Sequence, residues 1–273
     1  MQNSGEINAY ACVSTPDDQE FLRLVKTGYY ACVSYVDALF GQLMDELDRL
    51  GMADNTIVIV FGDHGWNLGE HGFVGKHTLM TTSTRVPLMI RVPGMAKGVS
   101  KSMVELVDIY PTICDLCGID APVQQLDGKS LTPILRNPSR SVKREVYVQW
   151  QGGDNLQDNR FNYAEWQKSG NTMLFDHNAD RDENANVSGN ADYAPTVNRM
   201  SKEMKKVKKF AFARSGLSKK NAFDYCHRLL AETFHRPFRY AQMLCDISSL
   251  GVFHLAHYES HTPLFAHICE CLF

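Results

Sequence analysis

The stretch 57-IVIVFGDHG-65 decides the fold of this 273-residue chain. Its first part, Ile57 to Phe61, is rich in β-branched residues and is typical of a strand buried on both faces of a parallel sheet. Before it, Phe21 to Leu50 carries apolar side chains at three- and four-residue steps, which predicts a long helix ending at Gly51. A helix followed by a short turn and a buried strand indicates an α/β architecture.

Further elements extend this pattern along the chain. Val86 to Val92 predicts a second strand, Val104 to Gly118 an amphipathic helix, and Leu131 to Leu135 a helical turn. Short strands divided by polar turns then suggest a small antiparallel subdomain, at 146–150, 163–166 and 173–175, followed by a loop rich in Asp and Asn at 176–190. We therefore divide the chain into an α/β part (1–145), an antiparallel subdomain (146–200) and an atypical basic tail containing His and Cys (201–273).

The charge balance excludes a globally basic nucleic-acid binder, because the net charge is only −3. The tail after residue 200 nevertheless carries 11 Lys or Arg against 6 Asp or Glu, whereas the first 200 residues carry 17 against 25. Its five lysines at 202, 205, 206, 208 and 209 could bind a polyanion, but such runs are usually solvated. We expect no nucleic-acid partner, and a tail that packs poorly on the α/β body and adds nothing to a metal site.

Membrane and export signals are not predicted. No apolar run approaches the ~18 residues that a membrane span needs, and the first ten residues, MQNSGEINAY, lack the basic and apolar regions of a signal peptide. The localisation therefore stays open. Eight Cys are too few for a disulfide scaffold. Cys114 and Cys117 form a C-x-x-C pair inside a predicted helix, and we expect buried, inert thiols there.

The candidate chemistry follows the strand at Phe61, because ligands in open α/β sheets gather beyond the carboxyl ends of strands. Asp63 and His64 stand there between two glycines, and a carboxylate beside an imidazole is a usual pair of metal ligands. The alternative is that Asp63 only caps the turn and His64 lies at the surface. Lys76 follows a Gly-rich loop and could pair with an anionic substrate group, or it could be a solvated lysine.

Several motifs together resemble the C-terminal half of a type I sulfatase, most closely the iduronate-2-sulfatase-like branch. The resemblance runs from about residue 20 to residue 200. It is carried by G-D-H-G at 62–65, G-E-H-G at 69–72, G-K-H-T at 75–78 and T-R-V-P-L at 84–88, and by VELVDIYPTICDLCGI at 104–119, LDGKSLTPIL at 126–135 and NYAEWQKSGNTMLFDHNADRDENANV at 162–187.

The resemblance implies an alkaline-phosphatase-like fold, with a central mixed sheet between helices and a small C-terminal antiparallel subdomain. It also implies a sulfuric ester hydrolase that acts on a sulfated sugar or glycosaminoglycan with Ca²⁺ and a formylglycine made from Cys or Ser in C/S-x-P-x-R. Such enzymes are usually lysosomal, periplasmic or secreted. The residues that match family positions are Asp63 and His64 (calcium ligands), Lys76 (catalytic, on the sulfate), and Trp66, His71 and His77 (near the sugar).

The chain also departs from the family pattern. None of its Cys or Ser begins a C/S-x-P-x-R motif, and the nearest look-alike, Arg136 to Arg140, has Arg where the nucleophile should stand. The N-terminal strand with the family's first calcium aspartates has no counterpart, Thr81 and Thr82 replace an acidic residue that often follows K-H-T, and 201–273 match nothing in the family. We expect a truncated gene model to account for this.

Three functions are compatible with these observations. The first is a sulfatase fragment that keeps half of the calcium site and is inactive alone. The second is a phosphatase or phosphodiesterase of the alkaline phosphatase superfamily, which would hold two transition metals in place of one Ca²⁺. The third is a catalytically inactive fragment or binding module.

Overall fold

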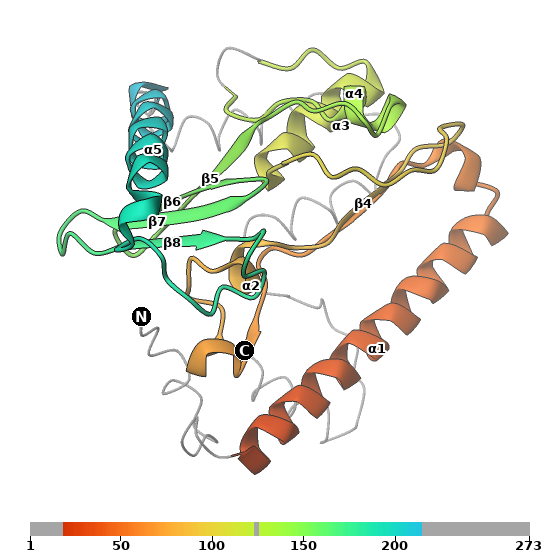
Figure 1. Ribbon diagram of the computed structural model, residues 1–273. Coiled ribbons are helices and arrows are strands. Elements are labelled where there is room, and N and C mark those ends of the chain that lie inside the picture. The colour runs from red at the N-terminus through yellow and green to blue at the C-terminus, as the bar shows by residue number, and fades with distance from the viewer. Residues whose placement is uncertain (1–18, 123–125, 215–273) are drawn as a thin grey trace. The chain divides into compact units, whose positions relative to one another are not determined.

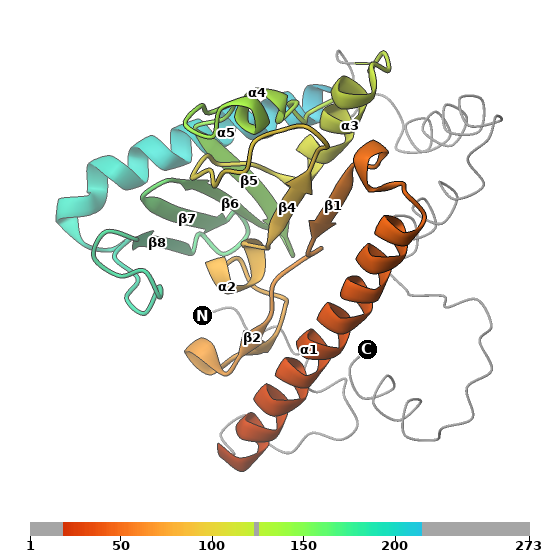
Figure 2. The same cartoon turned by 90° about the vertical axis from the view of Figure 1, so that its right-hand side faces the viewer.

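The computed structural model describes residues 19–122 and 126–214, with side chains up to Lys208 (Figures 1 and 2). The chain divides into two compact units after Val207, and the structure below is that of the first. The predictions made for residues 1–18 and 215–273, including the His- and Cys-containing part of the tail, lie outside the described residues. No helix in the described ranges is long and apolar enough to span a membrane.

Helix α1 (Gln19–Arg49) confirms the long helix predicted before the first strand. It ends two residues before Gly51, which takes a left-handed φ of 67° as expected after a helix. None of its residues is buried, and apolar side chains such as Leu24 (70% exposed) and Leu43 (63%) face outward. Its first turn still meets the site region, because a Cβ on Gly69 would stand only 3.1 Å from the side chain of Leu22.

Strand β1 (Val58–Phe61) follows the short turn η2 (Ala53–Asn55) and pairs antiparallel with β4 (Leu88–Arg91). The prediction of a strand buried on both faces of a parallel sheet is wrong for this part of the chain. Val58 to Val60 are half-buried and Phe61 is 47% exposed. The reason is that β4 is the only partner of β1 among the described residues, so the β-branched run is not enclosed.

Between β1 and β4 the chain forms a small hairpin and a short helix where the sequence predicts a Gly-rich loop. The hairpin pairs β2 (Asn67–Leu68) with β3 (Val74–Gly75), and its turn contains η3 (Glu70–Gly72). Helix α2 (Thr81–Thr84) then leads into β4.

The predicted helix at 104–118 is present as the turn η4 (Leu106–Asp108) followed by α3 (Ile109–Cys117). Gly118 closes it with a left-handed φ of 65°, and α4 (Thr132–Arg136) follows. Cys114 is buried as predicted, but Cys117 is exposed. The prediction of two buried thiols is therefore wrong for Cys117, which lies in the last turn of α3 where the helix meets solvent.

The antiparallel subdomain is a four-stranded sheet in the order β5-β6-β7-β8. Its strands are β5 (Glu145–Trp150), β6 (Gly153–Asp158), β7 (Phe161–Trp166) and β8 (Thr172–Asp176). Strand β6 was not predicted, because its sequence GDNLQD lacks an apolar alternation. It is nevertheless a central strand, and its first four residues are buried.

The two faces of this sheet pack against different parts of the chain. Tyr147, Leu156, Tyr163 and Leu174 are cross-strand neighbours, and this row packs with Met200 and Met204 of α5 (Ala194–Arg214). Because side chains alternate across a strand, Phe175 faces the other way, where it packs with Phe73 and Met80. The segment that leads to α2 therefore lies on the face of the sheet opposite α5.

Helix α5, which follows the turn η6 (Ala191–Tyr193), crosses the domain boundary expected at residue 200. Met204 is 1% exposed, and Val207 packs against the same cluster. Residues 201–207 therefore pack on the antiparallel subdomain, whereas the expectation of poor packing concerned the α/β body. The packing of α5 follows from the spacing of Met200, Met204 and Val207, which places one apolar stripe on a helix that is otherwise basic.

An ion pair at the end of β8, between a buried carboxylate and a half-exposed guanidinium, gives a pH-dependent prediction. The carboxylate of Asp176 is 3% exposed and accepts two hydrogen bonds from the Arg160 guanidinium, at 2.8 and 2.7 Å. Arg160 lowers the pKa of Asp176 to about 2. Because the folded-state pKa lies below the unfolded one, this stabilisation is complete above about pH 4 and is lost as the pH falls through 2.

This direction of the pH dependence is tested by urea unfolding of the wild type and of Asp176→Asn between about pH 2 and values above about pH 4. We expect the difference in free energy of unfolding to be constant above about pH 4 and to shrink between pH 4 and 2. A difference that stays constant or grows on acidification would contradict the assignment of Arg160 as the partner that stabilises the charged form.

Candidate functional site

The candidate metal pair lies where β1 ends. The backbone N–H of Gly62 donates to the Pro87 carbonyl at 3.2 Å, and the chain then turns away from β4. Asp63 Oδ1 accepts from the His64 backbone N–H at 2.9 Å, and its Oδ2 lies 3.5 Å from His64 Nε2. The Asp63 side chain is 79% exposed and that of His64 is 38% exposed. Asp63 thus caps its own turn, as in the alternative considered from sequence, while its carboxylate remains accessible.

Trp66 brings the two ends of the loop together. Its ring centroid lies 6.4 Å from that of His64, and Lys76 Nζ stands 5.5 Å from the centroid of the Trp66 ring. The second distance is within the range of a cation–π contact. Asp63 contacts His64, so the strand-end pair and the loop lysine are linked through one indole.

The β2–β3 hairpin explains why these residues meet. Asn67 pairs with Gly75 in the register, so their neighbours Trp66 and Lys76 extend from the same end of the hairpin. The pairing is reinforced by the Asn67 side chain, whose Nδ2 donates to the Gly75 carbonyl at 2.8 Å in a fully buried position. The nine residues from Asn67 to Gly75 therefore bring Lys76 back beside Trp66.

His71 and His77 have different positions. His71 lies in the turn η3 with a left-handed φ of 55°, at the end of the hairpin away from Trp66 and Lys76. The structure does not bring it to the indole. The ring of His77 stacks on that of Trp150 in β5, with centroids 4.7 Å apart and an interplanar angle of 21°.

Trp150 is a residue that the sequence reasoning missed. It is 37% exposed at the end of β5, and its contact with His77 joins the antiparallel sheet to the segment that carries Lys76. Its only sequence signal is a large aromatic at a strand end, and its partner 73 residues earlier in the chain cannot be read from local spacing.

The candidate metal ligands in this region are one carboxylate and one imidazole, those of Asp63 and His64. Calcium takes six to eight oxygen ligands, and no group of three or more His, Cys, Asp or Glu within 19–122 and 126–214 could hold a metal ion. Asp63 and His64 supply two accessible donors on one turn. The remaining ligands would have to come from other groups.

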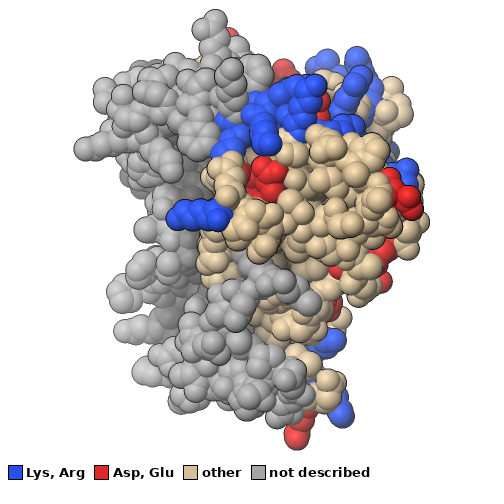
Figure 3. All heavy atoms as spheres, turned by 60° about the vertical axis from the view of Figure 1, so that its left-hand side comes forward, with Lys and Arg blue, Asp and Glu red and all other residues tan. Residues whose placement is uncertain are grey.

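The lysines of α5 form a basic surface separate from Lys76 in the sequence. Lys202, Lys205 and Lys206 are exposed, and Lys206 forms an ion pair with Glu203 at 2.7 Å. Figure 3 shows Lys and Arg side chains gathered at the top of one face of the molecule. The charge of Lys206 is thus partly neutralised by Glu203.

Gly65 allows a close approach that the site depends on. A Cβ at this position would lie 2.0 Å from the Thr82 carbonyl oxygen, and the Gly65 N–H donates to the Ser83 carbonyl at 2.8 Å. We expect Gly65→Ala to displace the turn between His64 and Trp66, and to lower the free energy of unfolding by about 1–3 kcal/mol.

Gly189→Ala is the matched control, because a Cβ there would meet nothing within 4 Å. Thermal unfolding, together with the fluorescence of Trp66, reports both effects. If Gly65→Ala were as stable as Gly189→Ala and left the Trp66 signal unchanged, the close packing of Gly65 against the Thr82 carbonyl of α2 would be contradicted.

Comparison with known families gives the class of protein. The sequence model of the Sulfatase family matches residues 4–119, and that of the C-terminal region of N-sulphoglucosamine sulphohydrolase matches residues 69–210. The chain belongs to the sulfatase family, whose members are sulfuric ester hydrolases, as the motifs at 62–88 and 162–187 predicted.

Individual relatives include several kinds of sulfatase. The choline-sulfatase of Rhizobium meliloti is 38% identical over 125 residues, which cover 45% of this chain and 24% of that protein. The iduronate 2-sulfatase of Homo sapiens is 33% identical over 133 residues, 39% of this chain and 24% of that protein. The N-acetylglucosamine-6-O-sulfatase of Bacteroides thetaiotaomicron is 31% identical over 197 residues, 64% of this chain and 33% of that protein. The chain thus spans about a quarter to a third of the length of these relatives.

Solved structures confirm the alkaline-phosphatase-like sulfatase fold. BT4656, in complex with its substrate D-glucosamine-2-N,6-O-disulfate, superposes with a TM-score of 0.60 at 27% identity, over 65% of this chain and 39% of that one. The phosphonate monoester hydrolase of Silicibacter pomeroyi gives a TM-score of 0.65 at 26% identity, over 74% of this chain and 46% of that one. The α/β part and the C-terminal antiparallel sheet both fall within this fold.

Proposed function

We propose that this chain carries the sulfate-binding side of a sulfuric ester hydrolase for sulfated sugars, with Lys76 as the residue that contacts the sulfate. The observation that carries the proposal is the Trp66 indole, which has His64 at one side and the Lys76 ammonium 5.5 Å from its centroid. One anionic group beside Trp66 could then reach both the lysine and the strand-end pair.

The chemistry of sulfate fits these groups. A sulfate ester carries a negative charge on its terminal oxygens, and a lysine ammonium pairs with such a group as a compact point charge. Asp63 and His64 would contribute two ligands to a calcium ion, which would offset further charge on the sulfate oxygens when bound. Trp66 keeps Lys76 near its position, because the cation–π contact limits the freedom of a long side chain.

A sugar substrate is supported by the aromatic groups around Lys76. Trp66 and the stacked pair of His77 and Trp150 offer apolar surfaces with polar edges, which suit the face of a sugar ring. Among the relatives, iduronate 2-sulfatase and N-acetylglucosamine-6-O-sulfatase are named after sugar derivatives. We propose that the activity is like that of the iduronate-2-sulfatase-like enzymes. The position of His71 at the far end of the hairpin from Lys76 does not support a role for it near the sugar.

Sulfate affinity tests the role of Lys76. We expect Lys76→Met to weaken binding of inorganic sulfate by about tenfold or more, which corresponds to losing one charge-assisted interaction of about 1.5–3 kcal/mol. Equilibrium dialysis with labelled sulfate measures it. Lys168→Met is the control, because Lys168 is an exposed lysine on the turn between β7 and β8. Equal affinity in Lys76→Met and wild type, or an equal loss in Lys168→Met, would contradict the proposal.

A second candidate is a hydrolase of phosphate or phosphonate esters. It is favoured by the likeness to two phosphonate monoester hydrolases, with TM-scores of 0.65 and 0.63. Competition between sulfate and phenylphosphonate for binding distinguishes the two candidate functions. Metal content also distinguishes them, because a sulfatase is expected to hold one calcium ion and a phosphate or phosphonate ester hydrolase two transition-metal ions. A chain that prefers phenylphosphonate and retains zinc or manganese would favour the second candidate.

A further inference from the structure

We propose that Glu183 is a positioning residue for Lys76: it fixes helix α2 from the antiparallel subdomain and, through α2, sets the backbone on both sides of the sulfate-binding lysine. This inference rests on the proposed function for the role of Lys76 itself. The sequence reasoning assigned no role to Glu183, which lies in the Asp- and Asn-rich loop after β8.

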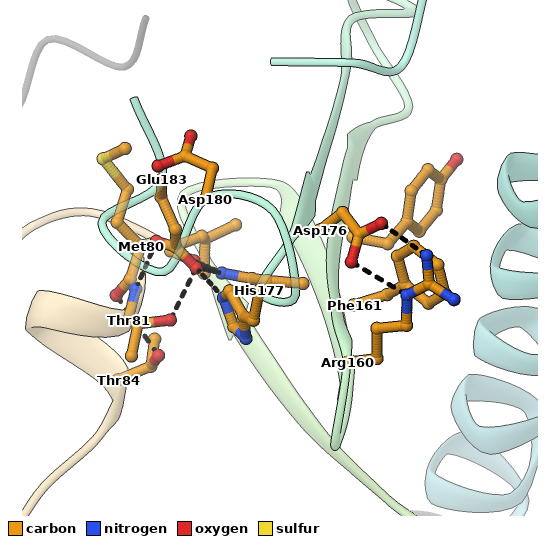
Figure 4. A network of polar contacts seen from close by, with 12 residues as sticks. Met80, Thr81, Thr84, Arg160, Phe161, Asp176, His177, Asp180 and Glu183 are labelled. Atoms are coloured by element: carbon orange, nitrogen blue, oxygen red, sulfur yellow. Dashed lines mark hydrogen bonds and ion pairs between the residues drawn. The ribbon is translucent and has the colours of Figure 1, made fainter. Parts of the chain in front are cut away.

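Glu183 is a buried carboxylate at the centre of a hydrogen-bond network (Figure 4). It is 3% exposed and has a left-handed φ of 58°. Its Oε1 lies 2.8 Å from His177 Nε2, and it accepts from Asn162 Nδ2 at 2.6 Å and from the Thr81 hydroxyl at 2.5 Å. Its Oε2 accepts from the Thr81 backbone N–H at 2.8 Å. A residue held in a rarely populated backbone conformation with this many donors is fixed by its surroundings.

The bonds to Thr81 form a tertiary cap on α2. Thr81 is the first residue of this four-residue helix, and the preceding Met80 provides no side-chain cap. A helix this short is not stable by itself. Glu183, which lies 102 residues later in the chain, supplies the acceptor that the first turn lacks and adds a negative charge at the helix N-terminus.

Hydrogen bonds from helix α2 lead to residues on both sides of Lys76, namely Gly75 and Thr78. The Ser83 hydroxyl lies 2.8 Å from that of Thr78, two residues after the lysine. The same hydroxyl accepts from Asn67 Nδ2 at 2.8 Å, and Asn67 also donates to the carbonyl of Gly75, the residue before the lysine. A displacement of α2 therefore moves the backbone on each side of Lys76.

Asn162 of β7 adds a second connection between the sheet and this segment. Its Nδ2 donates both to Glu183 and, at 3.4 Å, to the carbonyl of Leu79, midway between Lys76 and α2. Leu79 is 1% exposed. The antiparallel subdomain thus holds the return segment at two points, Leu79 and Thr81.

The charge state of Glu183 suits this role. Burial raises the pKa of Glu183, but the hydrogen bonds from His177, Thr81 and Asn162 together outweigh burial, so that the pKa lies below its ordinary value. The carboxylate is therefore ionised near neutral pH, the form in which both oxygens accept hydrogen bonds.

The test uses the full chain and three variants of the cap. Thr81→Val removes the hydroxyl donor to Glu183 but keeps the backbone N–H, Thr81→Ser restores the hydroxyl, and Glu183→Gln removes the charge. Asp176→Asn is the control, because it alters a buried carboxylate at the end of β8 whose partners are Arg160, Tyr193 and the Asn178 backbone N–H, and not a residue of α2.

The first readout needs no ligand: it is the ring-current shift that Trp66 imposes on the ε-methylene protons of Lys76, calibrated with Trp66→Leu. We expect it to fall by half or more in Thr81→Val and Glu183→Gln, and to be retained in Thr81→Ser and Asp176→Asn. The second readout is the affinity for inorganic sulfate, which we expect to weaken about tenfold in the first two variants only.

The possible outcomes separate this inference from the proposed function. If wild type binds sulfate through Lys76 but Thr81→Val and Glu183→Gln keep the ring-current shift and the affinity, the positioning role is wrong and the proposed function stands. If no variant binds sulfate but the shift is lost as expected, the positioning of Lys76 holds and its sulfate role fails. If Asp176→Asn loses the shift equally, the effect is general destabilisation and the inference is overturned.

Discussion

The 273-residue chain is expected to hydrolyse an aryl sulfate no faster than buffer containing calcium. Sulfatases of this type use a formylglycine made within C/S-x-P-x-R, and that motif does not occur between residues 1 and 273. A covalent mechanism depends on its nucleophile, and removing one costs about 10⁶-fold in rate. In the proposed function, Lys76 and the Asp63–His64 pair would stabilise charge on the sulfate but would not start the reaction. The measurement is release of the aromatic alcohol by the purified polypeptide.

Asp63→Ala and Lys76→Met serve as controls for contaminating sulfatase. We expect wild type and both variants to give the same background rate. A wild-type rate well above background that is lost in Asp63→Ala would contradict this account, because it would show that the chain contains a nucleophile of another kind.

Lys143→Met is expected to be the most destabilising single change in the connection between α3 and the antiparallel sheet. The Lys143 side chain is 7% exposed and contacts two carboxylates, Glu105 and the fully buried Asp108, the latter at 2.6 Å. Methionine keeps the length of the side chain but leaves two acidic groups without their cation. Breaking a buried charge cluster in this way costs about 3–5 kcal/mol.

Lys206→Met is the matched control. Its ion pair with Glu203 has side chains 55% and 31% exposed, and exposed pairs contribute about 0–1 kcal/mol. Chemical denaturation of both variants gives the two free energies. A loss below about 1 kcal/mol for Lys143→Met would show that Glu105 and Asp108 are adequately hydrated or paired without it.

The elements with regular periodicity were predictable from the sequence. The spacing in Phe21 to Leu50 gave α1, and the motifs around Asp63 and Lys76 gave the family and the neighbourhood of the site. Strand β6 was missed because Asp154 and Asn155 are buried there, with Asn155 held by the Tyr163 carbonyl at 3.0 Å. Buried polar residues in a sheet cannot be told from a polar turn by pattern alone.

The other features that the sequence did not predict depend on contacts between segments that lie far apart in the chain. Glu183 meets Thr81 across 102 residues, and His77 meets Trp150 across 73. Neither contact leaves a local signature in the sequence. The exposure of β1 was wrongly predicted for a related reason, since a β-branched run indicates a strand but does not show whether neighbouring strands enclose it.

The most direct test is the map of amide and indole signals that move when inorganic sulfate is added to the ¹⁵N-labelled chain. If sulfate binds beside Lys76, the Trp66 indole signal and the amide signals of Gly65 and Lys76 shift together and saturate at one concentration, and Lys76→Met abolishes the shifts. Shifts confined to the exposed lysines of α5, at 202, 205 and 206, or a Trp66 signal that does not move, would contradict the account.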